Sequence, residues 1–202
     1  DIKSLDNFDF EYYKNIREIL LEEFTLKEEY QSEKYKKKIK ELENLKNEGI
    51  KIIVINARRG DYVNTSRQTN RGIYLLDSDY YNLAFNRLLS DLDIQKKYKI
   101  LLFSDDESWI ISFANEQLKK IKLENVYKDF EFLGLGAFTD YEQISLMMLG
   151  DIFLIPNSTF AWWGAWLSQS ENKKVYAPKN WFIGKEWRRA NRDIVSNEWI
   201  RI

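Results

Sequence analysis

The stretch KIIVINARRGD, residues 51–61, decides how this 202-residue chain folds. Its first part, 51–56, is a short and continuous β-branched run, which is typical of a strand buried on both faces of a parallel sheet. The run passes directly into two arginines, a glycine and an aspartate. A buried strand that opens into a polar loop predicts an α/β fold with a ligand site at the carboxyl end of the strand.

Runs of the same kind recur along the chain, and helical patterns separate them. We expect further strands at 98–103, 151–155 and 174–177, with a short additional strand at 125–127. We expect helices at 77–92, 104–121, 139–149 and 158–167. Two of these helices open with the spacing of a capping box, Ser104 with Glu107 and Thr139 with Glu142. The alternation predicts a Rossmann-like parallel sheet with helices on both faces.

The beginning of the chain has a different composition. Residues 8–48 have the apolar spacing of two helices. Within them, 27–46 is rich in Lys and Glu, which is typical of a solvent-exposed helix face. Residues 57–76 follow the first strand as a long polar loop. We therefore divide the chain into a helical segment, 1–48, and a Rossmann-like domain, 49–202.

The composition narrows the classes of function. The chain has no cysteine and no histidine, so disulfides, thiolate metal sites and the commonest general base are excluded. The formal net charge is −1, whereas nucleic-acid-binding domains are usually clearly basic. No apolar run approaches the roughly 20 residues that span a bilayer. Catalysis would have to use carboxylates, Arg, Lys, Tyr, Ser or Thr.

Polar residues cluster where three of the predicted strands end. The clusters are Asn56, Arg58, Arg59 and Asp61 after the first strand, Asp105 and Asp106 after the second, and Asn157, Ser158 and Thr159 after the third. Because the carboxyl ends of parallel strands meet at one edge of a sheet, we expect a single convergent site there.

The arginine pair and the third cluster both suit a phosphate. A guanidinium binds oxyanions in a bidentate, charge-assisted way. The alternative to phosphate binding is an arginine that braces the loop by pairing with Asp61. We expect one arginine on the ligand and one bracing. Ser158 and Thr159 precede a helix, where they would either cap it or leave its first amides to a phosphate.

The acidic pair and the tryptophans each allow several interpretations. Asp105 and Asp106 could accept hydrogen bonds from a ribose or a guanine, hold a divalent metal, or cap the following helix. Trp162, Trp163 and Trp166 are expected to pack in the core, with one of them a candidate to line a sugar or base pocket.

Five segments of the sequence resemble the α-1,2-fucosyltransferases of glycosyltransferase family 11. INARRGDY is similar to the HxRRGDY segment of that family, FSDD to its FSDD segment, and NSTFAWWGAWL to its NSSFSWWAAWL segment. APKNWF and NEWIRI also match in order and spacing. In this sequence the five segments are residues 55–62, 103–106, 157–167, 177–182 and 197–202.

The resemblance implies a GT-B-like enzyme with two Rossmann-like halves, of which 49–202 would be the C-terminal, donor-binding part. Residues 1–48 would link to the N-terminal half or remain from it. The implied reaction is an inverting, metal-independent transfer of fucose from GDP-fucose to a sugar hydroxyl, often of a galactoside. By this resemblance, Arg58 would hold the donor pyrophosphate and Asp61 would order the loop. Asp105 or Asp106 would contact the nucleoside, and Ser158 and Thr159 would contact phosphate. Asn56, Arg59, Asn157 and Phe160 complete the expected donor site, and Arg58 and Asp61 are the candidate catalytic residues.

Two departures from the family pattern stand out. Asn56 occupies the position of the family's first motif residue, a histidine, and asparagine cannot carry a proton charge, so we expect reduced donor affinity or rate. The glycine-rich GGLGNQ segment of the family's N-terminal half is not found in the sequence. We therefore expect either a C-terminal portion or a chain whose start is missing from this sequence. If the segment is absent from the protein itself, we expect an incomplete acceptor site and no assured activity.

The expected partners are GDP-fucose and a glycan acceptor, without metal, other cofactor or nucleic acid. We expect a bacterial protein that is either free in the cytoplasm or peripheral to the inner face of the membrane. Two alternatives stay open: a non-catalytic nucleotide-sugar or glycan-binding domain, and a transferase that uses another nucleotide sugar. A phosphate-binding hydrolase is less favoured, because the sequence contains no nucleophile elbow or Walker loop.

Overall fold

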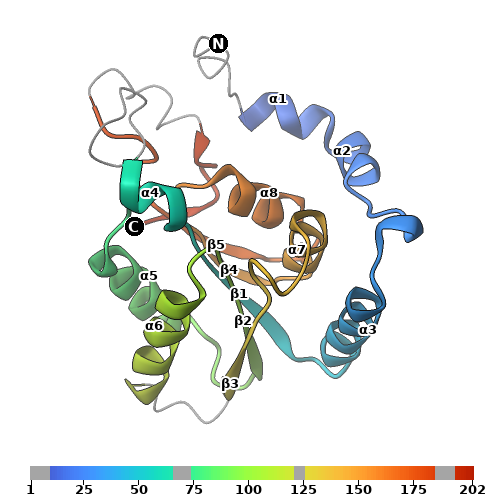
Figure 1. Ribbon diagram of the computed structural model, residues 1–202, viewed down its shortest axis with the longest axis horizontal. Helices are drawn as coiled ribbons and strands as arrows, with labels where there is room; N and C mark the ends of the chain where they lie inside the picture. The colour runs from blue at the N-terminus through green and yellow to red at the C-terminus, as the bar shows by residue number, and fades with distance from the viewer. Residues whose placement is uncertain (1–9, 66–73, 121–125, 185–193) are drawn as a thin grey trace.

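The computed structural model describes residues 10–65, 74–120, 126–184 and 194–202 (Figure 1). Its centre is a six-stranded sheet with the strand order β3-β2-β1-β4-β5-β6, and all neighbouring strands are parallel. The strands are β1 (Lys51–Ala57), β2 (Tyr98–Ser104), β3 (Val126–Phe132), β4 (Ile152–Leu154), β5 (Lys174–Ala177) and β6 (Ile200–Arg201). The predicted strands are confirmed. β6 was not predicted, because a strand of two residues is too short to produce an apolar pattern.

The strand order determines where a ligand can bind. The chain adds strands on one side of β1 and then, from β4 onward, on the other side. β1 and β4 are therefore neighbours at the point where the winding direction reverses. In open α/β sheets the ligand crevice lies beyond the carboxyl ends of the strands at this reversal.

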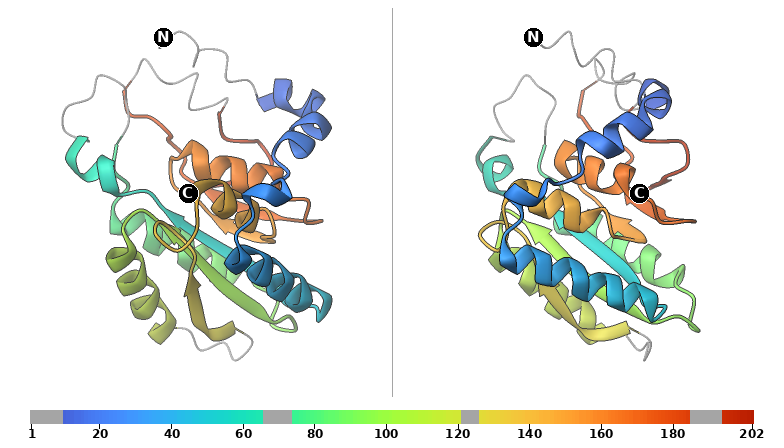
Figure 2. Two further views of the ribbon diagram at one scale, coloured as in Figure 1. Left: turned by 45° about the vertical axis from the view of Figure 1, so that its right-hand side comes forward. Right: turned by 90° about the vertical axis from the view of Figure 1, so that its right-hand side faces the viewer.

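Successive residues of a strand face opposite sides of the sheet, and each side is covered by helices (Figure 2). Ile52 and Val54 belong to a hydrophobic cluster that includes residues of α3 (Glu33–Asn47), α7 (Asp140–Met147) and α8 (Thr159–Leu167). Ile53 and Ile55 belong to a second cluster with residues of α5 (Ser78–Ser90) and α6 (Glu107–Lys120). The prediction of a Rossmann-like parallel sheet with helices on both faces is confirmed.

The N-terminal region contains more elements than the two helices that we expected. It forms α1 (Phe10–Asn15), α2 (Arg17–Glu23), a 3-10 turn (Glu28–Tyr30) and α3. α1 and α2 are separated at Ile16, which has φ −115° and ψ 15°. The ring of Phe24 stacks on Trp163 with centroids 5.3 Å apart, and Arg17 donates to the carbonyl oxygen of Ser168 at 3.1 Å. This region therefore packs against α8.

One predicted helix start is right and another is wrong. Glu142 accepts hydrogen bonds from the backbone nitrogen and the hydroxyl of Thr139, at 3.1 and 2.9 Å, as expected for a capping box. Ser104 does not cap α6, because it still belongs to β2 and pairs with Ala57. Asp106 caps α6 instead, since its Oδ1 accepts from the backbone nitrogen of Trp109 at 3.0 Å.

The polar loop expected at 57–76 contains a short helix, α4 (Gly60–Thr65). Residues 66–73 of that loop lie outside the described part of the chain. Within the described residues, no helix is both long and apolar enough to cross a lipid bilayer.

Candidate functional site

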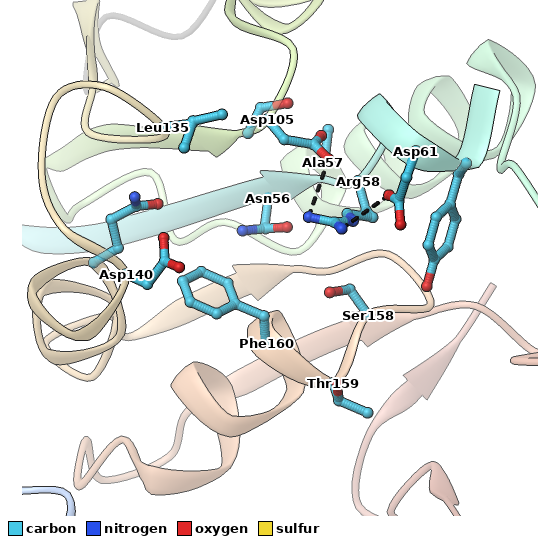
Figure 3. Close-up of a pocket in the computed structure, with 13 residues that line it drawn as sticks. Asn56, Ala57, Arg58, Asp61, Asp105, Leu135, Asp140, Ser158, Thr159 and Phe160 are labelled. Carbon is cyan, nitrogen blue, oxygen red and sulfur yellow. Dashed lines mark ion pairs between the residues drawn. The ribbon is translucent and has the colours of Figure 1, made fainter. Parts of the chain in front are cut away.

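A cavity of about 400 Å³ opens at the carboxyl edge of the sheet, at the reversal between β1 and β4 (Figure 3). The polar clusters that follow three strands contribute to its wall. Among the lining residues are Asn56, Arg58 and Asp61 after β1, Asp105 after β2, and Ser158, Thr159 and Phe160 after β4. Residues that are about 100 positions apart in the sequence thus share one cavity.

Arg58 lies in the cavity wall, where two carboxylates hold it. Its Nη2 is 2.8 Å from Oδ1 of Asp61, and its Nη1 is 3.1 Å from Oδ2 of Asp105. Figure 3 shows both ion pairs as dashed lines. The side chain keeps 39% of its surface exposed. The guanidinium is therefore fixed in direction while it remains accessible to an anion in the cavity.

Arg59 does not line the cavity, and its contacts brace the loop. Its Nε donates to Oδ2 of Asp106 at 3.2 Å, and its backbone nitrogen donates to Oδ1 of Asp105 at 2.8 Å. The guanidinium carbon lies 4.4 Å from the ring centroid of Trp109, at a distance suited to a cation–π contact. One arginine thus faces the cavity and the other braces, although the bracing partners are Asp105, Asp106 and Trp109 rather than Asp61.

The carboxylates of the two adjacent aspartates, Asp105 and Asp106, bond to other parts of the protein. Asp106 caps α6 and pairs with Arg59. Asp105 lines the cavity and has an arginine partner on each oxygen. Gly60 permits this close approach, because a Cβ there would lie 2.7 Å from Oδ2 of Asp105. In the described part of the chain, no group of three or more acidic side chains could hold a metal ion. A nucleoside contact from either aspartate stays a prediction.

The first turn of α8 faces the cavity without a side-chain cap. Ser158 occupies the N-cap position with extended backbone angles, φ −127° and ψ 126°, but its hydroxyl makes no capping hydrogen bond. It lines the cavity instead, near Arg58 in Figure 3. The first amides of a helix have no intrahelical acceptor and carry positive partial charge. The start of α8 therefore offers donors to an anion.

Asn157 and Asn56 have different surroundings. Asn157 does not line the cavity; its Nδ2 donates to the carbonyl oxygens of Tyr74 and Trp181, at 2.9 and 3.2 Å, and so supports the loop before α8. Asn56 lines the cavity and is only 4% exposed, with its Nδ2 3.8 Å from the sulfur of Met147. Donor binding by either residue stays a prediction.

Part of the cavity wall was not predicted from the sequence. Leu135, Asp140 and Gln143 line it from the segment after β3 and from α7. The side-chain nitrogen of Gln143 donates to the carbonyl oxygen of Phe138 at 2.9 Å, which fixes its orientation. The capping box at Thr139 was the available signal, because it marks a helix that starts at the same edge of the sheet.

The tryptophans of α8 pack in the core, as expected by default. Trp162 and Trp166 are buried, and Trp163 is half-buried against Phe24. None of the three lines this cavity; the aromatic ring of α8 that does so is Phe160.

α7 is held in place by the N-terminal part of the chain. Glu142, only 2% exposed, accepts a hydrogen bond from the backbone nitrogen of Ser32 at 2.9 Å. The hydroxyl groups of Tyr35 and Ser145 are 2.6 Å apart. Burial would raise the pKa of Glu142, but its hydrogen bonds with Ser32 and Thr139 outweigh burial, and the pKa is lowered. A charged Glu142 therefore ties residue 32 to one wall of the cavity.

The sequence was also compared with known protein families and curated proteins. The model described as Glycosyl transferase family 11 matches residues 2–202. The O-antigen biosynthesis glycosyltransferase WbnK of Escherichia coli is 30% identical over 151 residues, which cover 73% of this chain and 43% of that protein. The alpha-1,2-colitosyltransferase of Escherichia coli is 30% identical over 156 residues, covering 74% of this chain and 47% of that protein. The chain thus spans less than half the length of these curated relatives.

Among solved structures, POFUT1 in complex with GDP aligns with a TM-score of 0.44 and 14% sequence identity. The alignment covers 70% of this chain and 47% of that one.

Proposed function

Because the chain belongs to glycosyl transferase family 11, we propose that it forms the donor-binding part of a fucosyltransferase. The enzyme would move fucose from GDP-fucose to a hydroxyl of an acceptor sugar, with inversion, and we propose a galactoside acceptor and an α-1,2 linkage. The supporting observation is that Arg58 and the uncapped start of α8 line the same cavity.

The diphosphate of the donor would lie between these two features. Arg58 supplies a guanidinium, and α8 supplies its first amides together with the hydroxyl of Ser158. When GDP leaves, negative charge develops on its β-phosphate. Oriented donors that stabilise such charge often make the largest contribution to catalysis. The opposite end of α8 is consistent with this polarity, because Arg17 donates to the carbonyl oxygen of Leu167 and Lys173 to that of Trp166.

The nucleoside would occupy the part of the cavity that Leu135, Asp140, Gln143 and Phe160 line. Leu135 and Phe160 offer apolar surface to a flat base. Asp140 and the carbonyl oxygen of Gln143 offer acceptors for the N–H groups of guanine. This placement explains how a nucleoside could bind although Asp105 and Asp106 already pair with arginines.

The transfer itself needs one new bond, one broken bond and one proton acceptor. The acceptor hydroxyl attacks C1 of fucose from the face opposite to GDP, the bond from C1 to the phosphate oxygen breaks, and the hydroxyl proton passes to a carboxylate. Asp61 is our candidate for that carboxylate, since it lines the cavity and is 58% exposed. Its ion pair with Arg58 would place it beside the donor.

A second candidate function is transfer of a different deoxysugar, because one of the two relatives is an alpha-1,2-colitosyltransferase. A non-catalytic nucleotide-sugar-binding domain is the third, and Asn56 at the position of the family histidine supports it. We propose that the protein works in the cytoplasm or at the inner face of the membrane, where nucleotide sugars are available.

Calorimetry on the full-length protein with GDP, UDP and CMP tests the donor class. We expect GDP to bind tightest. A transfer assay with GDP-fucose and a galactoside then tests the reaction, which should continue when EDTA is present, since we propose no metal. Binding without transfer to any acceptor would favour the non-catalytic alternative, and preference for UDP or CMP would contradict GDP-fucose as donor.

A further inference from the structure

Tyr62 contacts Arg58 and the residue that directly precedes the start of α8. It belongs to α4, and its half-buried side chain lines the cavity. Its hydroxyl donates a hydrogen bond to the backbone carbonyl oxygen of Asn157 at 3.3 Å. The guanidinium carbon of Arg58 lies 5.6 Å from the centroid of its ring. One side chain therefore connects the loop after β1 with the loop before α8.

The direct pairing of β1 with β4 stops before it reaches these two loops. β1 and β4 pair only from Ile53 to Ile55 and from Ile152 to Leu154. Arg58 lies three residues beyond the paired part of β1, and Ser158 lies four residues beyond that of β4. The hydrogen bond from Tyr62 to Asn157 is a side-chain contact that bridges these two segments beyond the paired residues.

We propose that Tyr62 is a positioning residue that sets the separation between Arg58 and the start of α8 to fit a diphosphate rather than a monophosphate. The inference rests on the proposed function, since it assumes that the cavity binds a nucleoside diphosphate. A diphosphate carries two charged groups joined by one oxygen, so it can reach Arg58 and the start of α8 together. A monophosphate carries one charged group and depends less on their separation.

The ionisation of Tyr62 agrees with this role. Burial raises the pKa of its hydroxyl above the ordinary tyrosine value, and the nearby Asp61 and Asp105 raise it further, while Arg58 lowers it. The hydroxyl thus stays protonated at neutral pH, and only the protonated form can donate to the carbonyl oxygen of Asn157.

The affinities of the full-length protein for GDP and GMP, measured by calorimetry, test the proposal. Tyr62→Phe removes the hydrogen bond to Asn157 and keeps the ring beside Arg58. We expect it to weaken GDP binding about fivefold, the effect of one lost hydrogen bond. Tyr62→Leu also removes the ring, and we expect GDP binding to weaken about twentyfold. GMP binding should change by about twofold or less in both variants. The ratio of GDP affinity to GMP affinity should therefore fall in Tyr62→Phe and fall further in Tyr62→Leu.

The matched control is Tyr98→Phe. The hydroxyl of Tyr98 bonds to the backbone of Asp93 at the opposite edge of the sheet, and its loss should leave both affinities unchanged. If both Tyr62 variants keep the wild-type preference for GDP, or lose GDP and GMP affinity equally, Tyr62 does not set the separation. A wild-type protein that binds GDP no more tightly than GMP would instead contradict the proposed function itself.

Discussion

The two edges of the central sheet both carry charged side chains, yet they use them differently. At the amino edge, Asp151 is 5% exposed, and its carboxylate accepts hydrogen bonds from the backbone of Ile52 at 2.8 Å, from Lys51 at 3.0 Å and from Ser170 at 2.6 Å. At the carboxyl edge, Arg58 is 39% exposed in a cavity, and α8 begins without a side-chain cap.

The difference shows that charge alone does not mark a ligand-binding residue. What matters is whether protein partners already fill the hydrogen-bonding sites of the charged group. Asp151 has protein partners on both oxygens. The first amides of α8 and the outer face of Arg58 have room for an additional partner. Mutations at the amino edge should therefore change stability, and mutations at the carboxyl edge should change binding.

The largest expected effect is the loss of stability in Asp151→Ala. The substitution leaves the buried amide of Ile52 without its acceptor and removes the partner of Lys51. We expect the free energy of unfolding to fall by about 3 kcal/mol, measured by chemical denaturation of the full-length protein. Glu171→Ala, an exposed acidic residue near the same edge, should change it by about 0.5 kcal/mol or less. Equal effects of the two substitutions would contradict the structural role of Asp151.

Arg58→Ala should give the next largest effect, on binding. Removing a charged donor that faces a diphosphate should weaken GDP binding about 100-fold, or about 2.7 kcal/mol. We expect the free energy of unfolding to change by less than about 1 kcal/mol, because the side chain is partly exposed, Asp61 is open to solvent, and Asp105 keeps its hydrogen bond from Arg59. Arg87→Ala, which removes an exposed pair with Asp91, is the control and should not alter GDP affinity. An unchanged GDP affinity in Arg58→Ala would remove Arg58 from the donor site.

Ser32 and Ser158, at the starts of α3 and α8, should show a smaller difference of the same kind between stability and binding. Ser32 caps α3 by accepting from the backbone nitrogen of Tyr35 at 3.1 Å, so Ser32→Ala should cost about 1 kcal/mol of stability. Ser158 makes no such bond, so Ser158→Ala should cost less than about 0.5 kcal/mol. The latter should instead weaken GDP binding about fivefold. A full capping penalty at Ser158, with unchanged GDP binding, would show that its hydroxyl serves the helix alone.

The smallest expected effect is a pH dependence at the amino edge. Burial would raise the pKa of Asp151, but hydrogen bonds from Ile52, Ser170 and Lys51 outweigh burial, and the pKa is lowered. Its stabilising contribution should therefore be complete above the ordinary aspartate pKa of about 3.9 and be lost as the pH falls further. The difference in stability between wild type and Asp151→Asn should be constant from about pH 7 to 5 and shrink below about pH 4. A difference that grows on acidification would contradict this interpretation.

Most of the fold could be predicted because buried parallel strands carry an unusually clear pattern. The strand at 51–57 is continuous and β-branched, whereas β6 has only two residues and no pattern of its own. Helix starts were less certain, because a capping spacing does not reveal where the preceding strand ends. Ser104 had the right spacing, but its pairing with Ala57 keeps it in β2.

The convergence of the strand-end clusters was also predictable, since parallel strands end at one edge. Which atoms are already occupied could not be predicted. For Asp105 and Asp106 the sequence left ligand binding, metal binding and helix capping open; Asp106 caps α6, and both residues pair with arginines. Asp140 and Gln143 looked unremarkable, because only the position of α7 against the sheet brings them to the cavity.

The bond between Glu142 and the backbone of Ser32 has a practical consequence for anyone who trims this protein. A shortened version that begins at residue 49 would keep every strand and every residue that lines the cavity. It would nevertheless lose the Ser32 amide that donates to the buried carboxylate of Glu142. It would also lose Leu42 of α3, which is fully buried in the core. Nucleotide-binding measurements on fragments should therefore start upstream of residue 32.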